Sequence, residues 1–271
     1  MHKNTDEIEF TIFDTETTGL DPESGDRIVE IAGIRFKGKE RLAAFQTLIN
    51  PHRPISAAAF AVNKITADML KDAPETEEAL PKFLDFIQDS CISSYNAAFD
   101  LGFLKNELKL MGKGPPDNAV VDILKMARRI MPGLERYSLW FVADKLGIRA
   151  EQKHRAFSDV ELTLDVFNKL KEMLQVKGIL DFTNFLSLFG LNSRFLEDIN
   201  NQKIAKIQEA MGLRVNLKIK YLSGSAAVSE REVMPKEIRQ DNNRSYLVGY
   251  CCLKKEERTF RIDGILHLEI V

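Results

Sequence analysis

The chain has 271 residues, of which 44% are hydrophobic and 29% charged, with a formal net charge of -2, which excludes fibrous and largely disordered proteins. No apolar run approaches the roughly 20 residues that span a bilayer, and the opening MHKNTDEIEF lacks a basic end and an apolar stretch, so we expect a cytoplasmic protein without a membrane partner. The three cysteines have no zinc-ligand spacing, which argues against structural zinc and a disulfide framework.

The first elements along the chain are predicted strands. IEFTIFD is rich in β-branched and aromatic residues and ends near Asp14, where the turn-forming TGLDPESGD follows. RIVEIAGIRF and the stretch 41–49 are split by Lys37-Gly38-Lys39, which resembles a hairpin. We therefore expect the sheet to start with three antiparallel strands.

Helical spacing of apolar residues replaces the strand pattern farther along. It runs from about residue 66 to 87, where Pro74 and Pro81 are expected to break the helix, and it recurs over 100–111, 121–130, 137–146 and 156–174. A short strand, CISSYN, interrupts this half. The prediction is an α/β fold in which helices flank a mixed sheet.

The last part of the chain is predicted to be a separate unit. Residues 179–211 have helical spacing, and five short strand-like segments follow: VNLKIKYL, REVMP, YLVGYCCL, RTFRIDGI and HLEIV. We predict a first domain over 1–176, a helical linker over 177–212 and a small all-β barrel or sandwich over 213–271. From residue 203 onward there are 13 Lys/Arg against 9 Asp/Glu, or +4, which leaves 25 against 31, or -6, for residues 1–202.

A pair of acids ends the first predicted strand. Asp14 and Glu16 are separated by one residue, so the two-residue period of a strand directs both carboxylates to one side of the sheet. Neighbouring anions resist joint ionisation unless a cation compensates them, and Mg²⁺ or Mn²⁺ prefers oxygen ligands. Alone, Asp-x-Glu is more often a solvated strand end than a metal site.

Further motifs occur in an order that resembles the DnaQ-like exonucleases with a DEDDh active site, which have an RNase H-like fold. The first motif is FDTETTGLDPESGDRIVEIAGI, the second is YNAAFDLGFL with Asp100, and the third is HRAFSDVELTLDVF with His154 and Asp159. The resemblance covers about residues 8 to 174 and implies two divalent ions, Mg²⁺ or Mn²⁺, held by Asp14, Glu16, Asp100 and Asp159. It also implies hydrolysis of phosphodiester bonds from a 3′ end to give nucleoside 5′-monophosphates.

The spacing of the third motif indicates where its histidine lies. Five residues of helix turn about 140° away from the original face, so His154 and Asp159 do not share a face of one helix. We therefore expect His154 on the loop before a helix, where it acts as general base, and Asp159 in the first helical turn. Arg155 stands where the tyrosine variant of the family has Tyr, which favours the histidine subclass. Asp26, Glu30, Asp122 and Asp165 are interpreted as structural partners or solvated acids.

Candidate substrate contacts follow from position alone. Thr17, Thr18 and Gly19 come directly after the acid pair, and Gly19 lets the backbone approach a terminal nucleotide. Phe60 and Phe99 are candidates to stack on bases, although aromatic residues near helices are more often core residues. Asn96, three residues before Phe99, is the stronger polar candidate.

The C-terminal segment, from about Ile204 to Ile265, resembles a WYL domain. The matching pieces are QEAMG, LKIKYLSG, SEREVMP, SYLVGYC and ERTFRIDGI, with Ser245 where the family usually has Trp and Gly264 in place of a basic residue. The resemblance implies a small Sm- or SH3-like barrel that binds nucleic acid or a nucleotide ligand. Its candidate residues are Arg231, Tyr246, Arg258 and Arg261, since arginine suits phosphate, but alternate arginines are equally typical of a solvated strand face.

The function expected from these features is a metal-dependent 3′-5′ exonuclease that acts on nucleic acid, with single-stranded DNA favoured over RNA. Two alternatives stay open: a regulatory protein that senses nucleic acid or nucleotides through the barrel, and an exoribonuclease that acts on short RNA. Nothing in the motifs reads a 2′-hydroxyl. Polymerase, helicase or other repair partners and the oligomeric state are not specified by the motifs.

Overall fold

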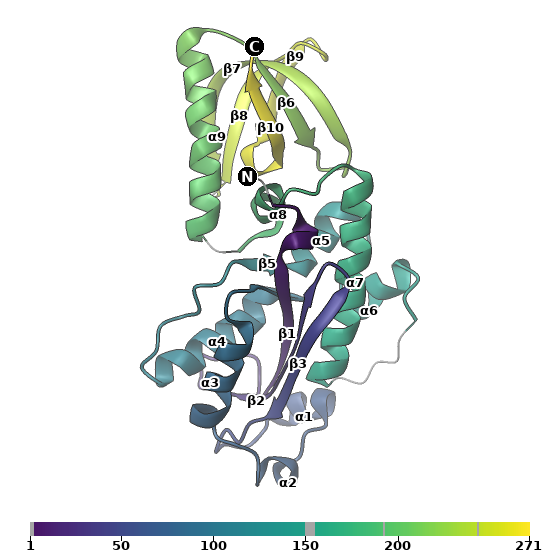
Figure 1. The fold of residues 1–271 in the computed structure, drawn as a ribbon, viewed down its shortest axis with the longest axis vertical. Helices are drawn as coiled ribbons and strands as arrows, with labels where there is room; N and C mark the ends of the chain where they lie inside the picture. Colours follow the sequence, from purple (N-terminus) through teal and green to yellow (C-terminus); the bar gives the residue numbers. More distant parts are fainter. Residues whose placement is uncertain (1–2, 150–154, 192, 243) are drawn as a thin grey trace.

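The computed structural model describes residues 3–149, 155–191, 193–242 and 244–271, which form two sheets with helices around them (Figure 1). The first sheet has the strand order β3-β2-β1-β4-β5. Its strands β1 to β3 are antiparallel, as predicted, whereas β4 and β5 run parallel to β1. The bounds of the strands are β1 Glu9–Thr17, β2 Ile28–Lys37, β3 Glu40–Leu48, β4 Cys91–Ser94 and β5 Val120–Asp122.

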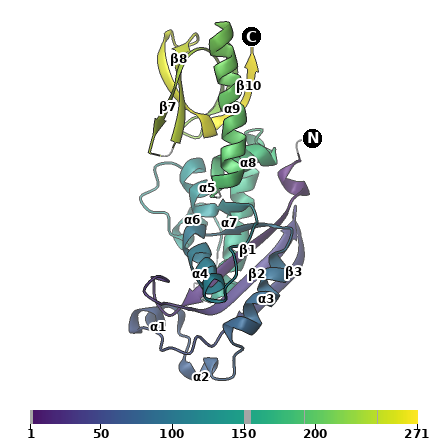
Figure 2. The same ribbon diagram turned by 90° about the vertical axis from the view of Figure 1, so that its left-hand side faces the viewer.

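Helices cover both faces of this sheet, which confirms the predicted mixed sheet with flanking helices (Figures 1 and 2). Phe10 and Ile12 of β1 are buried against helix α7 and its neighbours, while Phe13 is buried on the other face against α3 and α4. Even-numbered residues of β1 therefore face α7. The helices of this part are α1 Ala57–Asn63, α2 Ala67–Leu70, α3 Thr76–Ile87, α4 Ala97–Leu110, α5 Ile123–Ile130, α6 Leu139–Lys145 and α7 Ala156–Val176.

Two local predictions in this part were wrong, and one helix was missed. Pro81 lies inside α3 and does not break it. The apolar run at 121–130 begins as the strand β5 before it becomes helix α5, since a three-residue buried strand has too few residues to show a period. Helix α1 was not predicted, although Ser56 caps it by accepting a hydrogen bond from the backbone of Ala59 at 3.1 Å.

The C-terminal part is an antiparallel five-stranded sheet in the order β10-β6-β7-β8-β9, as the five predicted strand segments require. The strand β7 was expected to end at Pro235, but it continues well past that residue. The register shifts between Pro235 and Glu237, and an irregularity of this kind tolerates a residue that has no N–H to donate. The elements are α8 Phe182–Phe189, α9 Ser193–Leu213, β6 Leu217–Leu222, β7 Val228–Asp241, β8 Arg244–Cys251, β9 Glu256–Arg261 and β10 Ile265–Ile270.

The predicted linker region contributes to both cores. Phe185 and Phe189 of α8 are buried in the core around α7, whereas Ile207 and Ala210 of α9 are buried in the core of the second sheet. Asp263, in the turn between β9 and β10, accepts hydrogen bonds from Arg129 of α5 at 3.3 and 3.4 Å. These contacts join the second sheet to the first part of the chain.

Across the residues that the structure describes, no helix has both the length and the apolar character that a bilayer crossing requires.

Candidate active site

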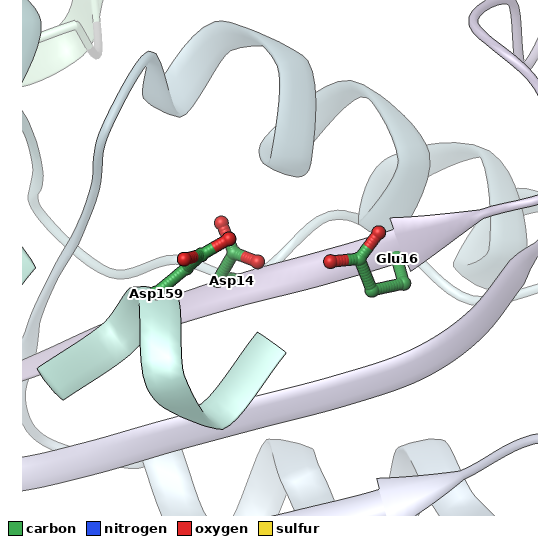
Figure 3. Close-up of side chains that lie close together, drawn as sticks. All are labelled: Asp14, Glu16 and Asp159. Carbon is green, nitrogen blue, oxygen red and sulfur yellow. The ribbon is translucent and has the colours of Figure 1, made fainter. Parts of the chain in front are cut away.

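Three of the predicted carboxylates meet on the α7 face of the sheet. Asp14 and Glu16 project from β1 (Figure 3). Asp159 projects from the first turn of α7, which is where the sequence predicted it. One carboxylate oxygen from each lies within 4.8 Å of the others. The period of the strand explains the meeting, because residues 14 and 16 share the face that α7 covers.

Asp100 reaches the same place from α4, but its oxygens are already occupied. Its Oδ1 accepts hydrogen bonds from the Thr15 backbone N at 2.9 Å and the Thr15 hydroxyl at 2.8 Å, and its Oδ2 accepts a bond from the Ser94 hydroxyl. Asp100 is buried and lies outside the trio of Asp14, Glu16 and Asp159. Its negative charge nevertheless raises the pKa of Asp14, second only to the effect of burial.

The acids of this cluster repel one another when no cation is bound. Burial, then the charges of Asp100, Glu16 and Asp159, raise the pKa of Asp14 well above its usual range. Burial and the charge of Asp159 raise the pKa of Glu16 to about 8. Burial also raises the pKa of Asp100 to about 6, although its hydrogen bonds from Ser94 and Thr15 work in the opposite direction.

This donor set fits divalent metal ions. Carboxylate oxygens are the ligands that Mg²⁺ and Mn²⁺ prefer, and the three side chains come close enough to share a small cation. The raised pKa values of Asp14 and Glu16 fit the same conclusion, since a bound cation would offset both the burial and the repulsion between acids that raise them.

The start of α7 is fixed by an ion pair on the same face. Arg155 donates from Nη2 to Glu30 Oε1 at 2.8 Å and from Nε to Glu30 Oε2 at 3.0 Å. Glu30 lies on β2 opposite Glu16 of β1 and is fully buried. Burial would raise the pKa of Glu30, but its hydrogen bonds from Arg155, Gln46 and the Ala156 backbone lower it overall. His154, the predicted general base, lies outside the described residues.

The segment after Glu16 is anchored to the protein by its own contacts. Thr17 and Thr18 are buried, and the Thr18 hydroxyl donates to Asp26 at 3.0 Å. A Cβ on Gly19 would lie 2.2 Å from Asp26 Oδ2, so the contact that requires glycine here is with Asp26. The sequence analysis explained this glycine by a close approach of the backbone to a nucleotide, and that contact stays a proposal.

The other predicted substrate contacts differ in their exposure. The Phe60 side chain on α1 is 43% exposed. Asn96 is exposed in a left-handed conformation with φ 68° at the start of α4, and its side chain makes no cap hydrogen bond. Phe99 is half-buried against Phe103, with a ring centroid distance of 5.0 Å.

The C-terminal sheet, β6 to β10, is called the barrel from here on. Its four candidate residues do not form one cluster of free side chains. Arg258 is exposed and donates to Glu256 at 2.6 Å. Arg261 donates from Nε to Asp263 at 3.1 Å, and its register partner on β8 is Tyr246. Arg231 lies on β7 opposite Ile219.

Sequence reasoning missed the side chains that hold the predicted acids in place. Thr15 and Ser94 fix Asp100, and Arg155 fixes the start of α7 through Glu30. Glu30 was assigned only to the class of structural partners or solvated acids. The available signal was a charged residue inside an otherwise apolar strand, because a buried acid requires a partner.

Comparisons with known proteins identify two families in the chain. The family profile described as Exonuclease matches residues 11–167, and the profile described as WYL domain matches residues 202–270. The chain is 30% identical over 243 residues to DNA polymerase III PolC-type from Staphylococcus aureus, covering 90% of this chain but 17% of that protein. The chain thus spans about a sixth of the length of this relative.

Solved structures share the fold. Exonuclease X in complex with 5′ overhanging duplex DNA is 25% identical with a TM-score of 0.51, and the match covers 70% of this chain and 98% of that one. The nuclease domain of 3′hExo, a DEDDh family member bound to rAMP, is 19% identical with a TM-score of 0.56, covering 66% of this chain and 97% of that one. With both family matches, the chain belongs to the exonuclease family and carries a WYL domain after its nuclease fold.

Proposed function

We propose that this enzyme hydrolyses single-stranded DNA from its 3′ end and releases nucleoside 5′-monophosphates, with two Mg²⁺ or Mn²⁺ ions at the carboxylate cluster. The observation that carries the proposal is the approach of Asp14, Glu16 and Asp159, whose oxygens lie within 4.8 Å of one another on the face covered by α7. Asp100 supplies the fourth negative charge. The family match supports nuclease chemistry at these acids.

Each side chain has a defined task in the proposed reaction. Asp14, Glu16 and Asp159 hold the cations, and Asp100 contributes charge from the position where Thr15 and Ser94 keep it. The cations, when bound, stabilise the attacking and leaving oxygens of phosphodiester cleavage. His154 in its neutral form accepts a proton from the attacking water, whose oxygen forms a bond to phosphorus while the bond from phosphorus to the 3′ oxygen of the shortened strand breaks. That 3′ oxygen takes up a proton, and the phosphate stays as the 5′-phosphate of the released nucleotide.

Contacts with the 3′-terminal nucleotide are proposed for the backbone of Thr17 to Gly19 and for Phe60, Asn96 and Phe99. Among the side chains, exposed Phe60 suits stacking and exposed Asn96 suits a polar contact. The barrel residues Arg231, Tyr246, Arg258 and Arg261 are proposed to contact nucleic acid farther from the cut. DNA is proposed as the substrate in preference to RNA because the Exonuclease X structure, 25% identical to this chain, holds DNA. The single-stranded form of that DNA is carried over from the sequence-based expectation.

The test uses oligonucleotides labelled at the 5′ end, as single- and double-stranded DNA and RNA, with Mg²⁺, Mn²⁺ or EDTA. Labelled single-stranded DNA should shorten as a ladder while mononucleotides appear, and EDTA should stop the reaction. Asp14→Asn and Asp159→Asn should lower the rate by about a thousandfold, the upper range for losing one electrostatic stabiliser. His154→Ala should lower it by about a hundredfold or more.

Asp165→Asn is the matched control. Asp165 lies on α7 with Asp159 but outside the acid cluster, so its loss of one charge should leave the rate unchanged. Equal rates in the wild type and Asp14→Asn would overturn the assignment of the active site. Faster degradation of RNA than of DNA would overturn the assignment of the substrate.

A further inference from the structure

A cavity of about 510 Å³ lies where α5 of the nuclease part meets the barrel. The nuclease part contributes Asn96, Asp122 and basic residues of α5 to its lining, and the barrel contributes Tyr221 and two arginines. Five lining side chains are cationic, namely Lys125, Arg128, Arg129, Arg244 and Arg261. None of these five belongs to the carboxylate cluster.

Two of the five cations share one carboxylate within the protein. Arg129 and Arg261 both donate to Asp263, with distances of 3.3 Å from Arg129 Nη1 and 3.1 Å from Arg261 Nε. Asp263 thus serves two guanidinium groups, and its pKa falls because both cations outweigh the effect of burial. The second acid at the cavity, Asp122, accepts a hydrogen bond from the backbone N of Lys125 at 2.8 Å.

In the part of the chain that the structure describes, the other three cations, Lys125, Arg128 and Arg244, form no ion pair within 4.0 Å. Lys125 Nζ donates to the carbonyl oxygen of Gly190 at 3.0 Å, and the Arg128 guanidinium lies 5.9 Å from the centroid of the Tyr137 ring. Five cations against Asp122 and Asp263 leave a formal charge of +3 around one cavity.

The cavity lies close to the carboxylate cluster along the sheet. Asp122, at the end of β5, pairs in register with Ser94 of β4, and Ser94 donates its hydroxyl to Asp100. Asn96 lines the cavity and directly precedes α4, the helix that carries Asp100. Two strand spacings, or about 10 Å across the sheet, separate β1 from β5, and a nucleic-acid strand crosses such a span within a few nucleotides.

We propose that this cavity binds backbone phosphates of the substrate strand a few nucleotides from the bond that is cut, with Arg128 and Arg244 as the principal contacts. The proposal rests on the exonuclease function proposed above and adds a second point of attachment for the strand. Arginine donors engage two phosphate oxygens at once, and these two guanidinium groups are exposed. The nuclease part supplies Arg128 and the barrel supplies Arg244, so a bound substrate strand would contact both parts of the protein at once.

A free nucleotide shares the phosphate chemistry but fits the lining less well. Among the described residues of the lining, Tyr221 is the only aromatic one. Its ring meets Phe260 edge-on at 5.2 Å, and its hydroxyl accepts a hydrogen bond from the Arg261 backbone at 3.3 Å. These contacts engage Tyr221 within the barrel, so the cavity favours a phosphate chain over a base.

The binding test uses a fluorescein-labelled 12-mer of single-stranded DNA, the full chain and EDTA, so that no hydrolysis occurs. Arg128→Gln and Arg244→Gln should each weaken binding about tenfold, and the slope of log affinity against log salt should become shallower by about 0.7 for each lost contact. Arg214→Gln removes the same charge from an exposed position after α9, outside the cavity lining and outside the proposed nucleic-acid contacts, and should bind like the wild type. Melting temperatures within a degree of the wild type establish that the variants are folded.

The hydrolysis test separates this proposal from the exonuclease function. With Mg²⁺, both cavity variants should raise KM for the 12-mer about tenfold at unchanged kcat, and their hydrolysis of bis(p-nitrophenyl) phosphate should equal that of the wild type. If the wild type cleaves neither substrate yet the binding loss persists, the proposed function fails and the phosphate site stands.

Two results would overturn the phosphate site itself. One is a wild-type enzyme that degrades the 12-mer while Arg128→Gln, Arg244→Gln and Arg214→Gln all bind alike. The other is displacement of the 12-mer by millimolar mononucleotide in the wild type but not in the cavity variants, which would assign the cavity to a free nucleotide.

Discussion

Arg155 and Glu30, which are 125 residues apart in the sequence, form a two-point ion pair with N···O distances of 2.8 and 3.0 Å. Glu30 also accepts the backbone N–H of Ala156 at 3.2 Å, so one buried carboxylate holds the first residues of α7. Asp159 follows within the same helical turn. The pair thereby fixes the position of the first turn of α7, and with it the position of Asp159 beside Asp14 and Glu16.

Replacing Arg155 with Met should destabilise the fold. Glu30 would keep its charge in a fully buried position with fewer donors. Breaking a buried pair costs about 3 to 5 kcal/mol, and the partial exposure of Arg155 reduces this to about 2 kcal/mol. Urea unfolding measures the loss. The double variant Arg155→Met/Glu30→Gln should recover part of it, and equal stability of Arg155→Met and the wild type would contradict the role of the pair.

Ser94→Ala should weaken metal binding near neutral pH. The variant removes a hydroxyl donor that lowers the pKa of Asp100, and a hydrogen bond to a charged group contributes about 1.5 to 3 kcal/mol. We expect the pH at which Mn²⁺ binding is half-maximal to rise by about one unit, measured by titration calorimetry. Ser93→Ala is the matched control, because the buried Ser93 hydroxyl has no hydrogen-bond partner among the described residues. Equal shifts in both variants would refute the specific role of Ser94.

The metal-free protein should lose stability as the pH rises from about 5 to 8. Unfolded Asp and Glu titrate near pH 4, whereas burial and neighbouring acids raise the pKa of folded Glu16 to about 8. Within that window the folded state binds more protons than the unfolded state, so stability falls by up to about 1.4 kcal/mol per pH unit for each extra proton. Thermal unfolding in EDTA checks this decline. Saturating Mg²⁺ or the substitution Asp14→Asn should flatten it, and a rise in stability with pH in EDTA would be incompatible with the cluster.

Gly19→Ala should cost about 2 kcal/mol, because the new Cβ would lie 2.2 Å from Asp26 Oδ2. Asp26 must then give up its bonds to the Thr18 hydroxyl and the Asp21 backbone. Gly102→Ala is the control: a Cβ there meets nothing within 4 Å, and alanine favours the interior of α4 by up to about 1 kcal/mol. Opposite signs are therefore expected in denaturant unfolding. A neutral Gly19→Ala would show that the loop yields without cost.

The sequence predicted the parts of the fold that depend on a repeated pattern. The three antiparallel strands, the short strand β4 and the five C-terminal strands were predicted from residue pattern and turn signals, whereas the parallel direction of β4 is a finding of the structure. β5 and the continuation of β7 past Pro235 were not predicted, because they depend on neighbouring strands that complete their hydrogen bonds. Pro81 is tolerated in α3 for a reason that the sequence pattern does not reveal.

The same distinction holds at the carboxylate cluster. The alternation of β1 directs Asp14 and Glu16 to one face, and the helical turn calculation places Asp159 at the start of α7. The partners of Asp100 and of Glu30 arise only from tertiary contacts, since Thr15 lies 85 positions from Asp100. His154 as general base stays a prediction.

The mutual repulsion of Asp14, Glu16 and Asp159 also bears on how such chains diverge. A gene copy released from selection for cleavage would gain stability by replacing any one of these acids, whereas a copy that keeps cutting must tolerate the strain. Descendants that survive as binding proteins should therefore lose the acids early while the barrel and its cationic cavity persist. Intact acids in a member of this lineage are a record of continued selection for catalysis.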